Sequence, residues 1–147
     1  MSAMNVDIAH LIQSSVAPVF LLSGVATTLS VLINRLGRIV DRARALEEQL
    51  EAHPHAPRER QVHADLKVLE KRADYLYVAI SLCAIAALLV ALVVVTLFAN
   101  FFLGSELAVL IAVLFVGAMV CLSAAFITFF IEVRLAVRAL RIGLTRA

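Results

Sequence analysis

Three long apolar stretches, separated by polar segments, dominate the pattern of the chain. They cover about residues 11–33, 76–102 and 107–131, and none of them contains Asp, Glu, Lys or Arg. Each is at least as long as the ~20 residues that a helix needs to cross ~30 Å of hydrocarbon. The pattern therefore predicts three transmembrane helices, and the second and third should form a hairpin around a turn that holds Gly104 and Glu106.

A different period fills the segment between the first and second stretches. Apolar residues recur there every three or four positions, as in the seam of a coiled coil. The two series are Ile39, Ala43, Leu46 and Leu50, then Val62, Leu66, Leu69, Ala73 and Leu76. Pro54 and Pro57 separate them, because proline removes a backbone donor and restricts the residue before it. Residues 34–75 are therefore predicted to form an antiparallel helical hairpin that continues the first and second spans without a break.

The composition agrees with a membrane protein. The 147 residues are 63% hydrophobic, against roughly 45–50% in a soluble globular domain. A soluble domain of this size has too little interior to bury that excess. The predicted fold is a single all-α membrane domain (residues 1–147) with three transmembrane helices and a helical hairpin between the first and second. Asn5 or Asp7 is expected to cap the first helix, and residues 132–147 form a basic tail.

The basic residues predict how the chain is oriented in the membrane. Of the 13 Lys and Arg residues, nine lie from Arg35 to Arg72 and four from Arg134 to Arg146. Loops rich in Lys and Arg stay in the cytoplasm. The hairpin and the tail are therefore predicted to be cytoplasmic, with the N-terminus outside.

One face of the first span is polar. Its residues are Ser23, Thr27, Ser30 and Asn34, whose spacing of three or four places them on one side of a helix. Two interpretations stay open. Hydroxyl groups can hydrogen-bond across a helix–helix contact, or several copies of the helix can turn this face toward a water-filled pore.

A proline and a glycine interrupt the same span. Pro18 frees a backbone carbonyl and is expected to kink the helix, and Gly24 follows within two turns. A kinked helix of this kind is a candidate gate.

Charged residues gather where the three spans end. They are Arg35, Arg38, Asp41, Arg42, Lys71, Arg72, Asp74, Glu132 and Arg134. We expect them to anchor the chain at anionic lipid headgroups and to form ion pairs between helix ends. In the pore interpretation, Asp7 lies near the outer mouth and Arg38 or Asp41 near the inner one.

Several other functions lack their usual residues. The predicted hairpin has nine basic residues against eight acidic ones, whereas a nucleic-acid surface needs an unbalanced basic stripe, so no nucleic-acid binding is predicted. The sequence holds no glycine-rich phosphate loop, nucleophile elbow or metalloprotease motif. His53, His55 and His63 have no Cys or carboxylate at metal-site spacing. We therefore predict no enzymatic activity, metal or cofactor.

The two cysteines lie inside predicted spans. Cys83 falls in the second and Cys121 in the third, and neither has a partner outside the membrane. We expect both to be small apolar packing residues.

Three sequence runs carry a family resemblance. They are Ala17–Gly24 (APVFLLSG), Arg35–Arg44 (RLGRIVDRAR) and Glu132–Ile142 (EVRLAVRALRI). Together they resemble a family of small bacterial membrane proteins known only as a domain of unknown function. The resemblance covers nearly the whole chain and implies the bacterial inner membrane, but no activity or ligand.

These patterns lead to two functional hypotheses. Three thin helices with a polar face favour self-association, and a closed homo-oligomer with cyclic symmetry is expected. The first hypothesis is a channel-like pore for ions or small solutes, lined by the first helix. The alternative is a non-conducting scaffold or regulatory subunit that binds a protein partner through residues 35–75.

Overall fold

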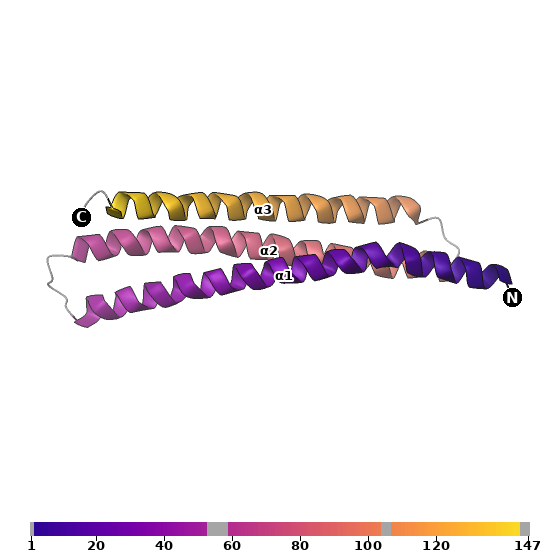
Figure 1. The fold of residues 1–147 in the computed structure, drawn as a ribbon, viewed down its shortest axis with the longest axis horizontal. Coiled ribbons are helices and arrows are strands. Elements are labelled where there is room, and N and C mark those ends of the chain that lie inside the picture. Colours follow the sequence, from indigo (N-terminus) through magenta and orange to yellow (C-terminus); the bar gives the residue numbers. More distant parts are fainter. Residues whose placement is uncertain (1, 53–58, 104–106, 145–147) are drawn as a thin grey trace. The chain divides into compact units, whose positions relative to one another are not determined.

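The protein is built from three long α-helices. The computed structural model describes the backbone of residues 2–52, 59–103 and 107–144, and the side chains of residues 12–13, 15–52, 59–102 and 107–137. Within these residues the helices are α1 (Ser2–Ala52), α2 (Glu59–Leu103) and α3 (Ala108–Leu144), labelled in Figure 1. All three are long and apolar enough to cross a membrane. The chain is therefore an all-α, multi-pass membrane protein.

The helix boundaries confirm one prediction, correct a second and extend the third helix into the basic tail. α1 and α2 each run without a break from the predicted span into the predicted hairpin. The prediction that Asn5 or Asp7 caps the first helix is wrong, because α1 already begins at Ser2. The predicted tail is largely helical, since α3 continues to Leu144. The sequence from Glu132 to Ile142 holds no Pro or Gly, so nothing in it stops the helix.

Buried residues recur at intervals of seven along each helix. They include Val25, Leu32 and Ile39 on α1, then Leu69, Leu76, Cys83 and Val90 on α2, and finally Ala118, Ala125 and Glu132 on α3. Seven residues are close to two helical turns, so each series follows one face of its helix. These faces form the protein's interior.

The helices pack in two compact units, and each helix contributes to both. Unit 1 comprises residues 1–29 and 81–124. Its buried apolar residues are Val25, Cys83, Ala86, Val90, Val93 and Ala118. Cys83, Ala86 and Ala118 are small, which lets helix backbones approach one another in lipid. A Cβ added at Gly117 would lie 3.6 Å from Cδ1 of Leu89, at ordinary contact distance.

Unit 1 also contains the start of α3. The backbone N–H of Leu107 donates to Oδ1 of Asn100, 3.0 Å away, and the N–H of Ile111 donates to the Leu107 carbonyl. Asn100, in the last turn of α2, therefore satisfies a backbone donor that the first turn of α3 leaves without a helical partner.

Unit 2 comprises residues 30–80 and 125–147. Its buried residues are Leu32, Ile39, Leu69, Leu76, Ala79, Ala125 and Glu132. Ile39 and Ala43 of α1 line one cavity together with Leu66 and Ala73 of α2, so these parts of the predicted hairpin lie side by side. Unit 2 differs from unit 1 in burying a charged side chain.

Within the apolar stretches, the outer faces of the helices carry many large apolar side chains. Large side chains such as Phe20, Phe102 and Val109 are exposed on the single chain. Water-soluble proteins rarely expose contiguous apolar surface of this kind. It is the surface expected of helices that face lipid acyl chains.

Candidate functional site: a buried carboxylate between two arginines

The most unusual residue of unit 2 is Glu132 on α3. It is 0% exposed and follows Ala118 and Ala125 on the buried face of that helix. An ionised carboxylate is costly to remove from water unless opposite charges and hydrogen bonds compensate it. The position therefore requires cationic partners, and these come from the other two helices.

Arg72 of α2 supplies the hydrogen bonds. Its Nε and Nη2 atoms both donate to Oε1 of Glu132, at 3.0 and 2.9 Å. The Arg72 side chain is 20% exposed, so water screens the pair only partly. Charge-assisted hydrogen bonds of this kind are among the stronger polar contacts in proteins.

Arg35 of α1 completes the cluster at the other oxygen of the carboxylate. Its Nη2 lies 2.9 Å from Oε2 of Glu132. This contact is an ion pair without hydrogen-bond alignment, because Oε2 accepts no hydrogen bond from the described residues. Cζ of Arg35 also lies 5.2 Å from the centre of the Phe129 ring, within reach of a cation–π interaction.

We call Arg35, Arg72 and Glu132 the charge cluster. It holds one residue from each helix, so it joins α1, α2 and α3 within unit 2. Its formal charge is +1, because two guanidinium groups share one carboxylate. The predicted ion pairs between helices are present here, but each partner lies inside its helix and not at a helix end.

A basic cavity of about 400 Å³ adjoins the charge cluster. Its walls are Arg35, Arg38, Ile39 and Arg42 of α1 with Leu69 and Arg72 of α2. Arg38 and Arg42 are exposed, whereas the apolar Ile39 and Leu69 are buried. We call this site the arginine cavity. Predicted mouth residue Arg38 belongs to it, whereas Asp41 is exposed and is not among its lining residues.

The predicted pore-lining residues are all exposed on the single chain. Ser23 and Thr27 belong to unit 1, and Ser30 and Asn34 to unit 2. The Thr27 hydroxyl donates to the Ser23 carbonyl at 3.0 Å, and that of Thr28 donates to the Gly24 carbonyl at 2.9 Å. These hydroxyls therefore satisfy their donors within α1 and keep acceptor lone pairs available.

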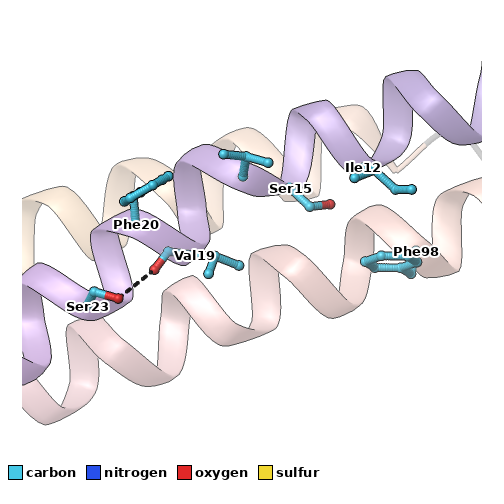
Figure 2. A pocket seen from close by; sticks show the side chains of 7 residues that line it. Ile12, Ser15, Val19, Phe20, Ser23 and Phe98 are labelled. Carbon is cyan, nitrogen blue, oxygen red and sulfur yellow. Dashed lines mark hydrogen bonds between the residues drawn. The ribbon is translucent and has the colours of Figure 1, made fainter.

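Ser23 borders an apolar groove in unit 1 (Figure 2). The groove has a volume of about 380 Å³ and is lined by Ile12, Ser15, Val16, Val19, Phe20 and Ser23 of α1 and Phe98 of α2. The Ser23 hydroxyl donates to the Val19 carbonyl of its own helix, at 3.5 Å. With few polar groups on its walls, the groove suits an apolar occupant better than a polar ligand.

The remaining predicted residues are placed as follows. α1 runs through Pro18, which is buried, and Gly24 is exposed with open space where a Cβ would lie. The Asp7 side chain lies outside the described residues. The kink at Pro18 and Gly24 stays a prediction.

Among the residues that the structure describes, no group of three or more His, Cys, Asp or Glu side chains could hold a metal ion. His63 is exposed and lies 4.0 Å from Glu59 of its own helix, while His53 and His55 fall outside the described residues. Cys83 is buried and Cys121 half-buried, both as free thiols.

Sequence reasoning placed the three members of the charge cluster among nine membrane-edge charges expected to anchor the chain and to form ion pairs, without saying which of them would pair. It did not predict that Glu132 is buried. The signal was present in the sequence, because Ala118, Ala125 and Glu132 are spaced by seven on a helix whose interior face needs small residues. A charged residue on such a face indicates an interhelical partner.

Comparison with known proteins gives a family and no activity. A family model described as protein of unknown function (DUF2721) matches residues 15–142. No curated protein and no solved structure matches the chain.

Proposed function

The chain belongs to the DUF2721 family, whose function is unknown, and from this premise we propose that it is a homo-oligomeric, channel-like membrane protein lined by α1. The polar face of α1 would look toward copies of itself around a central axis. A pore lined by uncharged hydroxyl and amide groups suits the passage of ions or small solutes.

One observation carries this proposal. Ser23, Thr27, Ser30 and Asn34 are exposed on α1, so the described part of the subunit leaves each of them at least partly uncovered. Polar side chains within membrane helices favour the interior of a bundle or a water-filled cavity over lipid. A closed ring of subunits supplies such an environment, because each subunit presents the same face to its neighbours.

The proposal includes an orientation in the bacterial inner membrane. The Lys and Arg residues of the chain lie in residues 35–72 and 134–146, which the positive-inside rule puts in the cytoplasm. The N-terminus would then be outside. Reporter fusions active only in the cytoplasm should fluoresce at the C-terminus and stay dark at the N-terminus. The reverse result would overturn the orientation.

Flux through reconstituted protein tests conduction. Liposomes holding the unmodified protein should release an ion or small-solute gradient, and Ser23→Leu/Thr27→Leu should abolish that release by making the face apolar. Thr96→Leu is the matched control, because the Thr96 hydroxyl also donates to a carbonyl of its own helix but lies on α2. Absence of flux from the unmodified protein across all gradients tried would refute conduction.

Crosslinking in mild detergent tests the assembly separately. A homo-oligomer should give a ladder that stops at one subunit number. If crosslinking gives monomer alone, both the proposed ring of subunits and the proposed pore are refuted.

A second candidate function rests on another observation. A cavity of about 780 Å³ lies between α1 and α2 in unit 2, with apolar walls at Ile39 and Leu66 and charged rims at Glu47, Lys67 and Glu70. A non-conducting scaffold would bind a protein partner there, along a coiled-coil stalk. An identified partner that crosslinks to these residues and is released by Ala43→Arg would favour the scaffold over the pore.

A further inference from the structure

We propose that the arginine cavity binds a phosphate-bearing anion, in the form of a phospholipid headgroup or free phosphate. Four guanidinium groups line it, from Arg35, Arg38, Arg42 and Arg72. Arginine is suited to phosphate because its planar fork donates two parallel hydrogen bonds to a pair of oxygens. This inference does not depend on whether the protein conducts.

The charge balance of the cavity favours an anion. Glu132 is the only carboxylate in ion-pair contact with these arginines among the described residues. Four positive charges and one negative charge leave a formal surplus of +3. Like charges that line one cavity repel one another when it is empty, so a bound anion lowers the electrostatic free energy of the site.

The arginines keep donors for such a ligand. Each guanidinium has five N–H donors. Arg72 uses two of its N–H groups on Oε1 of Glu132, and Arg35 contacts Oε2 through Nη2 alone. Most of the donors of these two residues therefore stay available after the charge cluster has formed.

The charge cluster also prepares the cavity for binding. Glu132 and Phe129 fix the Arg35 side chain, and Glu132 fixes Arg72. Side chains that are already ordered lose less conformational entropy when a ligand binds. Arg38 and Arg42, which are exposed, can close on the ligand from the solvent side.

The position of the cavity along the helices matches the depth of lipid phosphates. Arg35 comes two residues after the first apolar stretch ends at Ile33, and Arg72 comes four residues before the second begins at Leu76. Basic side chains at this level meet the headgroup region. Buried Ile39 and Leu69 provide the apolar base of the cavity.

The test uses the full chain with Arg38→Gln/Arg42→Gln, because these arginines make no ion pair with Glu132. The matched control is Lys71→Gln/Arg134→Gln, which removes two exposed charges at the same membrane edge but outside the cavity. Without ligand, neither variant should have a lower thermal midpoint than the unmodified protein in neutral detergent. That result shows that the cavity variant is folded.

Two arms identify the source of the phosphate. The first arm measures the binding of inorganic phosphate to the protein in neutral detergent. Chloride at equal ionic strength serves as the control. The second measures by native mass spectrometry how much phosphatidylglycerol is retained from mixed micelles with phosphatidylcholine, with oleate as a carboxylate competitor. Binding in the first arm assigns free phosphate, and retention only in the second assigns a lipid headgroup.

The expected loss follows from the two charges removed. Each arginine near an anionic surface contributes about fivefold in affinity, so the cavity variant should bind roughly 25-fold more weakly. The control should change by no more than about threefold. Equal losses in the cavity variant and the control would overturn the proposal, as would the absence of binding in both arms or equal retention of oleate.

Discussion

Unit 1 and unit 2 draw on the same three helices but bury different chemistry. The core of unit 1 is made of small and medium apolar residues such as Ala86, Val90 and Ala118. The core of unit 2 contains larger leucines, at positions 32, 69 and 76, together with the fully buried Glu132. In unit 1 the helices are held together by close packing. In unit 2 they are held together by packing and also by ion pairs.

The difference shows how a thin membrane bundle acquires a unique register. Small residues permit close approach at many registers, and lipid offers no hydrophobic drive that selects one. A buried carboxylate accepts only the register that brings its arginines within hydrogen-bond distance, because the unpaired state is so unfavourable. In this chain we expect the charge cluster to supply that specificity.

The largest effect should come from Glu132→Ala. It leaves Arg35 and Arg72 facing each other without their counter-ion, and breaking a buried pair costs about 3–5 kcal/mol. Unfolding in mixed micelles, followed by circular dichroism, measures the loss. Glu70→Ala, at an exposed position of α2, is the control and should stay within about 0.5 kcal/mol. A similar small loss for both variants would show that the cluster adds no stability.

Arg72 and Arg35 should contribute unequally to the free energy of unfolding. Arg72→Gln removes two hydrogen bonds to Glu132, whereas Arg35→Gln removes an ion pair without hydrogen-bond alignment. We expect losses of about 3 and about 1.5 kcal/mol in the free energy of unfolding. The same micelle titration measures both. A larger loss at Arg35 than at Arg72 would contradict the geometry of the cluster.

Overpacking should affect both units alike. Ala118→Leu in unit 1 and Ala125→Leu in unit 2 each add volume to a buried position of α3, at a cost of about 1–3 kcal/mol. Ala112→Leu, at an exposed position of the same helix, is the control and should be neutral. If only Ala125→Leu destabilises the protein, close packing in unit 1 does not limit its stability.

The smallest effect should come from Thr27→Val. This near-isosteric change removes one exposed hydroxyl that donates to the Ser23 carbonyl. Exposed positions of this kind change stability by no more than about 0.5 kcal/mol. Thermal unfolding of the subunit checks the value. A loss above 1 kcal/mol would mean that the polar face stabilises the single subunit itself.

Much of the fold follows from the sequence, because length and apolar runs specify membrane helices directly. The continuity of α1 and α2 into the predicted hairpin followed from the same reasoning. The length of α3 was not predicted, because the segment after the third span was described only by its basic charge. Charge alone does not end a helix, and α3 runs on to Leu144.

The candidate site was harder to predict than the fold. The sequence identified the face with Ser23 and Thr27, because spacing along one helix is visible in one dimension. The charge cluster joins residues that are 37 and 60 positions apart, from Arg35 to Arg72 and from Arg72 to Glu132. Which of nine charges at the membrane edge would pair depends on how the helices face one another, and spacing along each helix does not give that.

A double-mutant cycle between Arg72 and Glu132 tests most directly whether the charge cluster specifies the packing of the three helices. It compares Arg72→Met, Glu132→Met and the double variant with the unmodified protein in micelle unfolding. We predict that the double variant loses less free energy of unfolding than the two single variants lose together. The difference, which is the coupling energy, should be about 2 kcal/mol. Losses that add within about 0.5 kcal/mol would contradict the account.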